Sequence, residues 1–461
     1  MNVRTFENRR PGAEIRGEKA MWSRQRLMDR AFKLTLLGAA LTLWVQMSRA
    51  QSGIEEPINI IGQPVGIGAR ALGMGGAYVA AADDYTAVYW NPAGLALIRK
   101  MEVNLALSHT RHRDEASAAG ITVEDRMSQT RLNAAGLVVP VPTYRGSLVF
   151  AFGYHRPKTF DNSFSFKWFN PTPNDRVTQH WNEFEEGYLD VWSVGGAIDL
   201  SPNLSVGGAL NVWGGKNDYQ WALREFDTEN LYTFRQGIDG DNITTSVKAS
   251  ELKAGALFRL GDLIRLGATV TLPRTYTFSE DWSTSSKTDF DDGSSDLQGN
   301  SGSYEYKLNF PFVFSAGACL RLLNLTASGE LEFTDWSQVK YSSDPPVAEY
   351  TRTEANLFIH ENYRATTSVK VGAEFTLPAT GIQLRGGLAL VPSPLRNVSS
   401  EYDRKYFSLG LGVLLDKQLK LDLSWTRGMW TQTTPRLTED VVDLSEKVHR
   451  DLFLATVAFR F

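Results

Sequence analysis

The sequence predicts an all-β fold, a transmembrane antiparallel β-barrel of about 14 strands with an N-terminal hatch, or plug, in its lumen. Beyond residue 100, short segments alternate apolar and polar residues with the two-residue period of a strand. The links between these segments alternate between short and long. Charged residues make up 22% of the chain and the mean hydropathy is −0.26, which excludes a bundle of membrane-spanning helices.

Fourteen segments have this strand character. In residues 419–426, for example, Leu421, Leu423 and Trp425 alternate with polar residues such as Asp422 and Ser424. The segments are roughly 102–110, 131–140, 147–156, 188–200, 204–215, 247–260, 263–273, 304–322, 325–335, 365–377, 382–391, 405–415, 419–428 and 450–461. Pro311 interrupts the eighth of them.

The link lengths point to a barrel in a membrane. Links after the even-numbered segments hold two to six residues, whereas those after the odd-numbered ones hold 13 to 31 polar residues, as in 157–187 and 281–303. All short turns would then lie at one end and all long loops at the other, which is the layout of outer-membrane barrels. A soluble sandwich gives no reason for this asymmetry, and a propeller would show a repeat of 40–50 residues, which we do not find.

The first 50 residues have the features of a secretory signal. Basic residues precede an apolar stretch over residues 34–45, and small residues at 48 and 50 predict cleavage after Ala50. A membrane anchor is the alternative, but the apolar stretch is short for a span. Removal of this segment leaves a net charge of −10, because ten of the 48 basic and four of the 52 acidic residues lie in it. We therefore expect no nucleic-acid partner.

Residues 53–100, which we call the leader segment, differ from the rest of the chain. They are rich in glycine and alanine and lack strand alternation. The lumen of a 14-stranded barrel is too wide for its own side chains to fill, so a compact segment fits inside it. An extension packed outside the barrel is the alternative. We expect a signal peptide at 1–50, a hatch at 51–101 and a barrel at 102–461.

The stretch GARALGMGGAYVAAADDYTAVYWNPAGLA in the leader segment resembles the N-terminal signature of the FadL/TodX-type outer-membrane transporters of hydrophobic compounds. PorV-type relatives carry a similar stretch. The strand end at residues 332–337 (EFTDWS) and the Leu384-Arg385-Gly386-Gly387 stretch are also similar to FadL-like chains. The aromatic C-terminus, with Phe459 and Phe461, resembles the barrel-assembly signal of such proteins, which implies the barrel-assembly machinery as a partner.

The resemblance implies a hatch that moves to release hydrophobic ligands, which in the family leave through an opening beside a kinked third strand. It assigns hatch and gating roles to Gly73, Met74, Gly75, Gly76, Asn91, Pro92 and Ala93. In the third predicted strand, Gly153 is the one candidate kink position.

Charged residues on the lumen side of the predicted strands are a second set of candidates. They include Glu330, Lys370, Glu374, Arg385 and Asp422. Ion pairs that anchor the plug are one interpretation, and head-group contacts of a ligand through Lys370 or Arg385 are the other. His109 with His112, and the acidic residues at 289–296, are candidate metal ligands, but their pattern favours polar loops. We predict no metal, no cofactor and no enzymatic activity.

Two functions remain open at this point. The first is passive uptake of hydrophobic molecules, such as long-chain fatty acids or hydrocarbons, across a Gram-negative-type outer membrane, with membrane lipid and a hydrophobic small molecule as partners. The second is a PorV-type role as anchor or shuttle for exported proteins, which the long loops would support equally well.

Overall fold

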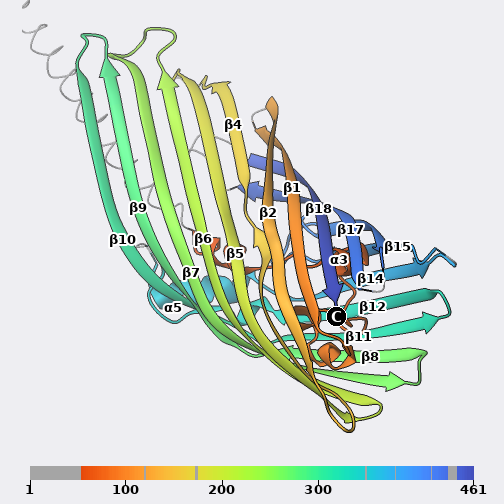
Figure 1. The fold of residues 1–461 in the computed structure, drawn as a ribbon. Helices are drawn as coiled ribbons and strands as arrows, with labels where there is room; N and C mark the ends of the chain where they lie inside the picture. The colour runs from red at the N-terminus through yellow and green to blue at the C-terminus, as the bar shows by residue number, and fades with distance from the viewer. Residues whose placement is uncertain are drawn as a thin grey trace, which may run out of the picture. The chain divides into compact units, whose positions relative to one another are not determined.

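The strands form one closed antiparallel sheet (Figure 1). The computed structural model describes residues 53–461 apart from 119–120, 172–174, 348–349, 379, 417 and 435–443, so the predicted signal peptide lies outside the described residues. The strands are β1 (Glu102–Ala118), β2 (Ile121–Val141), β3 (Leu148–Thr159), β4 (Asn162–Phe169), β5 (Thr178–Ser201), β6 (Leu204–Phe226), β7 (Phe234–Leu260), β8 (Ile264–Thr271), β9 (Arg274–Phe290), β10 (Ser295–Phe310), β11 (Val313–Leu322), β12 (Leu325–Asp335), β13 (Lys340–Tyr341), β14 (Ala365–Thr376), β15 (Gln383–Val391), β16 (Arg404–Leu414), β17 (Leu419–Thr434) and β18 (Leu444–Arg460).

The sheet closes where the first strand meets the last. Glu102 of β1 pairs with Arg460 of β18, and the opposite side of β1 pairs with β2. Three of the strands that cross the barrel wall are each interrupted, so that each consists of two consecutive strands. β3 and β4 both pair with β5, and β8 and β9 both pair with β7. In the same way, β10 pairs with β9 and β11 pairs with β8. With the two-residue β13 set aside, the barrel has 14 wall strands, which confirms the predicted antiparallel barrel of about 14 strands.

Two prolines mark the breaks within these walls. Pro273 separates β8 from β9, and Pro311 separates β10 from β11. A proline has no N–H to donate to a neighbouring strand. The two breaks lie side by side, because Phe310 pairs with Arg274 and Val313 pairs with Thr271.

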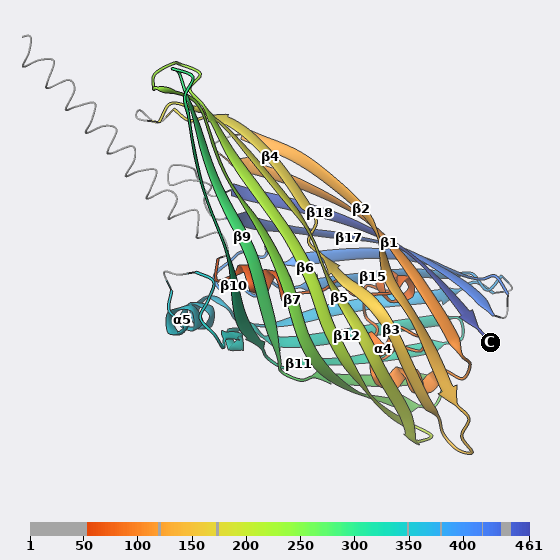
Figure 2. The same cartoon turned by 60° about the vertical axis from the view of Figure 1, so that its left-hand side comes forward.

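Much of the sequence expected to form long loops is strand. β9 continues to Phe290 and β10 begins at Ser295, so a four-residue turn replaces most of the expected loop 281–303. The expected loop 157–187 contains β4 and the first part of β5. These additional strand residues extend the barrel wall, and we call them the extension. Figure 2 shows β6, β7, β9 and β10 running side by side in it. The residues at 281–303 are polar on both faces, so they lack the alternation by which lipid-facing strands are recognised.

The two faces of the barrel differ as predicted. Outward-facing apolar side chains such as Leu388 and Val371 are about half exposed, at 54% and 46%. Inward-facing Glu330, Arg385 and Asp422 are buried. The described residues contain no helix with the length and apolar composition to cross a membrane.

The leader segment packs against the inner face of the barrel. It contains the helices α2 (Glu56–Ile61), α3 (Ala69–Gly73) and α4 (Ala87–Trp90) and the 3-10 helix η2 (Pro92–Leu97). Residues 69–98 form one buried apolar cluster with inward-facing residues such as Ala134, Ala209 and Leu454. α2 belongs to a second cluster, together with residues of β5, β6, β7, β9 and β10, the 3-10 helix η3 (Trp336–Gln338) and α5 (Arg352–Asn362).

Candidate functional site

Glycines in the barrel wall let the leader backbone approach the strands closely. A Cβ atom on Gly372 of β14 would collide with the carbonyl oxygen of Met74, and one on Gly387 of β15 would collide with the backbone of Gly75. Gly75 itself has a φ of +66°, a conformation that favours glycine. Other inward-facing wall glycines in contact with the leader segment are Gly136, Gly153, Gly195, Gly207, Gly255, Gly267 and Gly410.

The residues singled out in the leader segment all lie on this contact surface. Gly73 lies against Gly410 of β16, Met74 is fully buried, and Gly76 has a φ of +73°. Asn91 accepts a hydrogen bond from the Ala93 N–H (3.1 Å), and its Nδ2 donates to the carbonyl oxygens of Val79 (2.8 Å) and Ala256 of β7 (3.2 Å). Asn91 thus fixes the start of η2, which begins with Pro92, and ties it to the wall.

Arg385 lies inside an ion-pair network. Its Nε is 2.6 Å from Glu374 Oε2, and its Nη1 is 2.8 Å from Asp422 Oδ1. Arg70 of α3 also contacts Glu374, with Nε 2.8 Å from Oε2. The Arg385 side chain has no exposed surface. In this arrangement it supports the carboxylate that holds Arg70, so the geometry favours anchoring of the leader segment over ligand contact.

Arg70 has a second acidic partner within the leader segment. Its Nη1 is 2.5 Å from Asp83 Oδ1, and Arg265 of β8 lies 3.1 Å from Asp83 Oδ2. Burial alone would raise the pKa of Asp83, but the charges of Arg70 and Arg265 outweigh it and hold the pKa well below its ordinary value. Asp83 therefore stays ionised and joins the leader segment to β8.

Lys370, the other predicted head-group contact, lines a cavity. Its Nζ lies 3.0 Å from Glu330 Oε1 and 3.2 Å from Glu332 Oε2. Glu330 also accepts hydrogen bonds from the N–H groups of Tyr78 and Val79, both at 2.9 Å. Glu330 therefore joins the leader backbone to Lys370.

The cavity next to Lys370, which we call the central cavity, has a volume of about 140 Å³. Ile61, Gln63, Pro64 and Val65 of the leader segment line part of it. The barrel and the rest of the leader contribute aromatic rings and charges in equal measure. These residues include Trp90, Trp213, Phe310, Trp336 and Tyr406, and the charged Glu251, Lys253, Arg274, Glu330, Glu332 and Lys370. The cavity therefore offers apolar surface together with polar groups that could orient a ligand.

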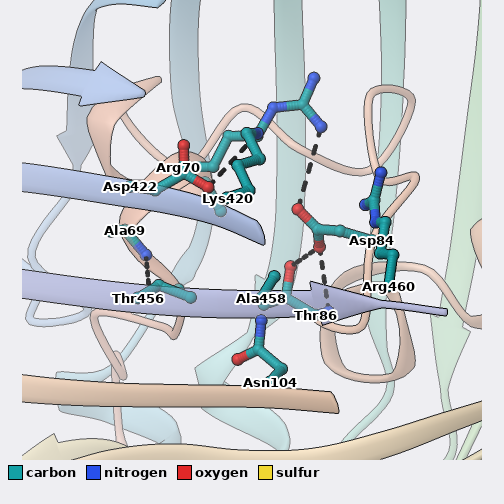
Figure 3. Close-up of a pocket in the computed structure, with 12 residues that line it drawn as sticks. Ala69, Arg70, Asp84, Thr86, Asn104, Lys420, Asp422, Thr456, Ala458 and Arg460 are labelled. Carbon is teal, nitrogen blue, oxygen red and sulfur yellow. Dashed lines mark hydrogen bonds and ion pairs between the residues drawn. The ribbon is translucent and has the colours of Figure 1, made fainter. Parts of the chain in front are cut away.

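A much smaller polar pocket lies between α3 and the last strands (Figure 3). Its volume is about 10 Å³, the size of one water molecule. Ala69 donates its N–H to Thr456 Oγ1 (3.1 Å), and Lys420 lies 3.3 Å from Asp422 Oδ2. The pocket is too small for an organic ligand.

α2 lies in an apolar environment that we call the α2 site. Ile58 and Ile61 are 2% and 4% exposed. Lys158 of β3 donates to the carbonyl oxygens of Asn59 and Gly62, and the Tyr341 hydroxyl donates to the carbonyl oxygen of Ile54 (3.0 Å). The α2 site consists of Leu189, Tyr276, Phe278, Tyr306, Leu308, Trp336, Tyr341 and Ile359, all buried in one cluster with α2.

The third wall strand departs from regular pairing near Pro157. β2 pairs with β3 only as far as Ala134 and His155, and the register between β3 and β5 shifts between His155 and Lys158. Over the described residues, the part of β2 that precedes Ala134 has no ladder partner on the edge that faces β3. Gly153, the candidate kink position, pairs regularly with Gly136 and Ser193 and makes room for the Tyr85 hydroxyl.

A buried chain of hydrogen bonds was not predicted from the sequence. The Tyr85 hydroxyl lies 3.2 Å from His155 Nδ1, and His155 Nε2 lies 2.9 Å from Ser193 Oγ. Ser193 donates to Asn211 (2.6 Å), and Asn211 donates to Glu251 (2.8 Å), which lines the central cavity. Tyr85 comes from the leader segment, whereas the other four residues lie at inward positions of β3, β5, β6 and β7. The only sequence signal for these four was their strand parity, which becomes useful once the register between strands is known.

The candidates for metal binding do not come together. His109 and His112 both lie within β1, where residues three apart point to opposite faces. Asp289 is part of β9, whereas Asp291 and Asp292 lie in the turn that follows. The part of the chain that the structure describes contains no group of three or more His, Cys, Asp or Glu residues arranged to hold a metal ion.

The aromatic C-terminus faces outward. Phe459 and Phe461 are 40% and 50% exposed, and Phe459 pairs with Val103 of β1 and Leu419 of β17. Phe461 donates its N–H to the carbonyl oxygen of Met101 (3.0 Å). Both residues therefore lie at the seam that closes the barrel.

A closed antiparallel barrel with an apolar outer face and a polar inner face is the architecture of an outer-membrane channel protein. Residues 189–461 match the family model described as outer membrane protein transport protein (OMPP1/FadL/TodX). The chain belongs to this family, and the match confirms the resemblance seen in the sequence. A search of curated protein sequences finds no match.

Solved structures of similar fold include a FadL homologue from Pseudomonas aeruginosa, with 13% identity, a TM-score of 0.61, and coverage of 87% of this chain and 100% of that one. The toluene transporter TodX from P. putida has 12% identity and a TM-score of 0.61, with coverage of 87% and 99%. The toluene transporter TbuX from Ralstonia pickettii has 12% identity and a TM-score of 0.55, with coverage of 87% and 100%. At these identities the likeness shows the fold.

Proposed function

We propose that this outer-membrane transport protein takes up small hydrophobic compounds passively, and that the leader segment is the movable barrier in the lumen. The observation that carries this proposal is the central cavity, which lies between the leader segment and the wall and is lined by aromatic rings and charges. The driving force would be the transfer of apolar surface out of water, worth about 25 cal/mol per Å² buried. The family match favours transport over the anchoring role of PorV-type proteins.

The size of the central cavity bears on the ligand. Its volume of about 140 Å³ is close to the roughly 150 Å³ of an engineered apolar cavity that binds benzene. With the leader segment in place, the central cavity thus admits a compound the size of a single ring. Lys370 is the favoured polar contact, because it lines the cavity, whereas Arg385 is enclosed by Glu374 and Asp422.

Release from the cavity would use the discontinuity at Pro157. The β2–β3 ladder ends at His155, and the family resemblance implies a lateral exit beside the third strand. We further propose that lipid of the outer membrane surrounds the outward-facing apolar band, and that the assembly machinery recognises the C-terminal strand with Phe459 and Phe461.

Removal of residues 53–90 tests the gating role. We expect the truncated protein, reconstituted in lipid vesicles, to pass toluene and small polar dyes faster than the full chain, because the contacts that block the lumen are gone. Heat-modifiable migration in gel electrophoresis would verify that the barrel still folds. Gating by the leader segment would be wrong if a folded truncated protein passed both probes at the rate of the full chain.

A further inference from the structure

The outer face of the barrel carries a patch of basic residues at the end of its apolar band nearest the extension. Trp425 of β17 and Phe453 of β18 face outward at this end of the band and pair with each other. The next outward row toward the extension holds Arg111, Asp451 and Arg427. We call the surface formed by this row and the two rows beyond it the basic patch. Its basic residues are Arg111, Arg113, Arg126, Lys405, Arg427, Lys447 and His449, and its acidic residues are Glu115, Glu124 and Asp451.

Two of the carboxylates in the basic patch are already occupied. Arg427 donates to Asp451 with Nε and Nη2, at 2.8 and 2.7 Å. Arg113 and Arg126 are directly opposite each other on β1 and β2, and both pair with Glu124. Like charges in directly opposite positions destabilise a sheet, and here one carboxylate serves two guanidinium groups. This part of the patch therefore keeps an excess of positive charge.

The remaining cations of the basic patch add to this excess. Within the part of the chain that the structure describes, Arg111, Lys405 and Lys447 form no ion pair. Glu115 lies opposite Lys447 in the β1–β18 ladder, but these two described side chains do not form an ion pair either. The Arg111 guanidinium lies 5.6 Å from the centre of the Phe453 ring, which places it directly beside the apolar band.

The wall formed by β5, β6 and β7 differs at the corresponding level. Trp192 of β5 faces outward there, and the next outward row holds Asp190 and Lys248 on either side of Gly214. Asp190 pairs with Arg156 at 2.6 Å. Charges of both signs thus lie together on this side of the barrel, and the basic patch is a feature of the side formed by β1, β2, β16, β17 and β18.

The position of the basic patch bears on its partner. The extension takes the place of the long links, which in outer-membrane barrels lie on the extracellular side. The patch therefore lies at the height of the head groups of the outer leaflet. Clusters of arginine and lysine beside an apolar membrane surface attract acidic lipid head groups. The fork of N–H groups on a guanidinium matches the oxygen atoms of a phosphate.

We propose that the basic patch binds the phosphate groups of a phosphorylated glycolipid in the outer leaflet. The apolar band directly below the patch favours a lipid over free phosphate as the source of these groups. Leu107, Leu423 and Val457 are 49%, 40% and 42% exposed there and offer a surface for acyl chains. The inference depends on the outer-membrane position of the barrel and not on the compound that it transports.

The variant Arg111→Gln with Lys447→Gln tests the proposal. In detergent micelles and without divalent cations, wild type should bind lipid A with two phosphates more tightly than lipid A with one. The double variant should bind the two-phosphate lipid about 30-fold more weakly, because each cation near an acidic lipid surface contributes about fivefold. The measurement is native mass spectrometry of protein titrated with each lipid, and heat-modifiable migration verifies the fold.

Two further variants separate charge from local packing. Arg111→Lys with Lys447→Arg keeps both charges and should bind like wild type. Lys248→Gln removes an exposed cation outside the basic patch and should also leave the affinity unchanged.

Three results would overturn the proposal. The first is equal affinity of wild type and the folded double variant for two-phosphate lipid A. The second is equal affinity of wild type for the two lipids, which would show that phosphate is not recognised. The third is displacement of the lipid by excess inorganic phosphate, which would indicate a site for the free anion.

Discussion

At the scale of single residues, glycines in the wall and charges in the lumen hold the leader segment. The sequence predicted which residues face inward, because strand parity is visible in the alternation. It did not predict that inward-facing Gly372 and Gly387 make room for the leader backbone. Which segment packs against a glycine depends on how distant parts of the chain are aligned. For the same reason the pairing of Glu374 with both Arg70 and Arg385 could not be read from the chain.

The close approach at Gly372 can be tested by adding a side chain. Gly372→Val should displace the leader segment near Met74 and increase the flux of small polar dyes through vesicles, because a Cβ at this position collides with the Met74 carbonyl. Gly329→Val is the matched control on the neighbouring strand β12, where a Cβ would meet no atom within 4 Å. Equal dye flux in the two variants would show that the wall tolerates the added side chain.

At the scale of elements, the 14 predicted segments are all wall strands. Their ends at the short turns were predicted well, but their ends at the long links were not. β5, β7 and β9 extend through regions that were expected to be loops, because above the lipid both faces of a strand meet water or polar groups and no apolar alternation is required. α2 was missed as a separate element, since a helix of six residues carries almost no periodic signal.

Glu56 makes the position of α2 sensitive to pH. Burial, then the nearby Glu280, raise the pKa of Glu56 from 4.5 to about 7, whereas Lys158 opposes the shift and Glu55 adds to it. A raised pKa favours the neutral acid in the buried state. The stabilisation of α2 is therefore complete below about pH 4.5 and is lost as the pH rises through about 7.

We expect α2 to leave its site more readily at pH 8 than at pH 5. A nitroxide attached to Asn59→Cys, on the exposed side of α2, should become more mobile over this range in electron paramagnetic resonance spectra. The native Cys319 is buried and would remain unlabelled. Glu56→Gln in the labelled protein should remove the pH dependence. If it persisted, another group facing α2, such as Glu185 of β5, would have to be responsible.

At the scale of the whole molecule, the barrel has two regions. Its apolar outer face meets lipid, and the polar extension of its strands meets water. The sequence predicted this division in outline, because long polar links follow every second strand. It could not set the boundary, since β9 and β10 continue as strands far beyond the last apolar alternation.

A pair of arginine substitutions tests where the lipid ends. Leu388 lies in the middle of β15 and faces outward with 54% exposure, so Leu388→Arg should destabilise the folded barrel by about 2–4 kcal/mol in lipid. Leu297 lies in the extension of β10 and is 71% exposed, so Leu297→Arg should leave stability unchanged. Urea unfolding in vesicles compares the two. A similar cost at both positions would place the extension in the membrane.

The leader segment and the closing seam belong to one continuous piece of chain, which has a consequence for biogenesis. Residues 53–100 run directly into β1, and β1 completes the ring by pairing with β18, which follows the other strands of the sheet in the chain. The leader contacts strands on both sides of the ring, so its entry into the lumen before β1 and β18 join avoids threading it into a closed barrel. We therefore expect the strands to close around the leader segment, so that each barrel has this segment in its lumen from the moment of closure.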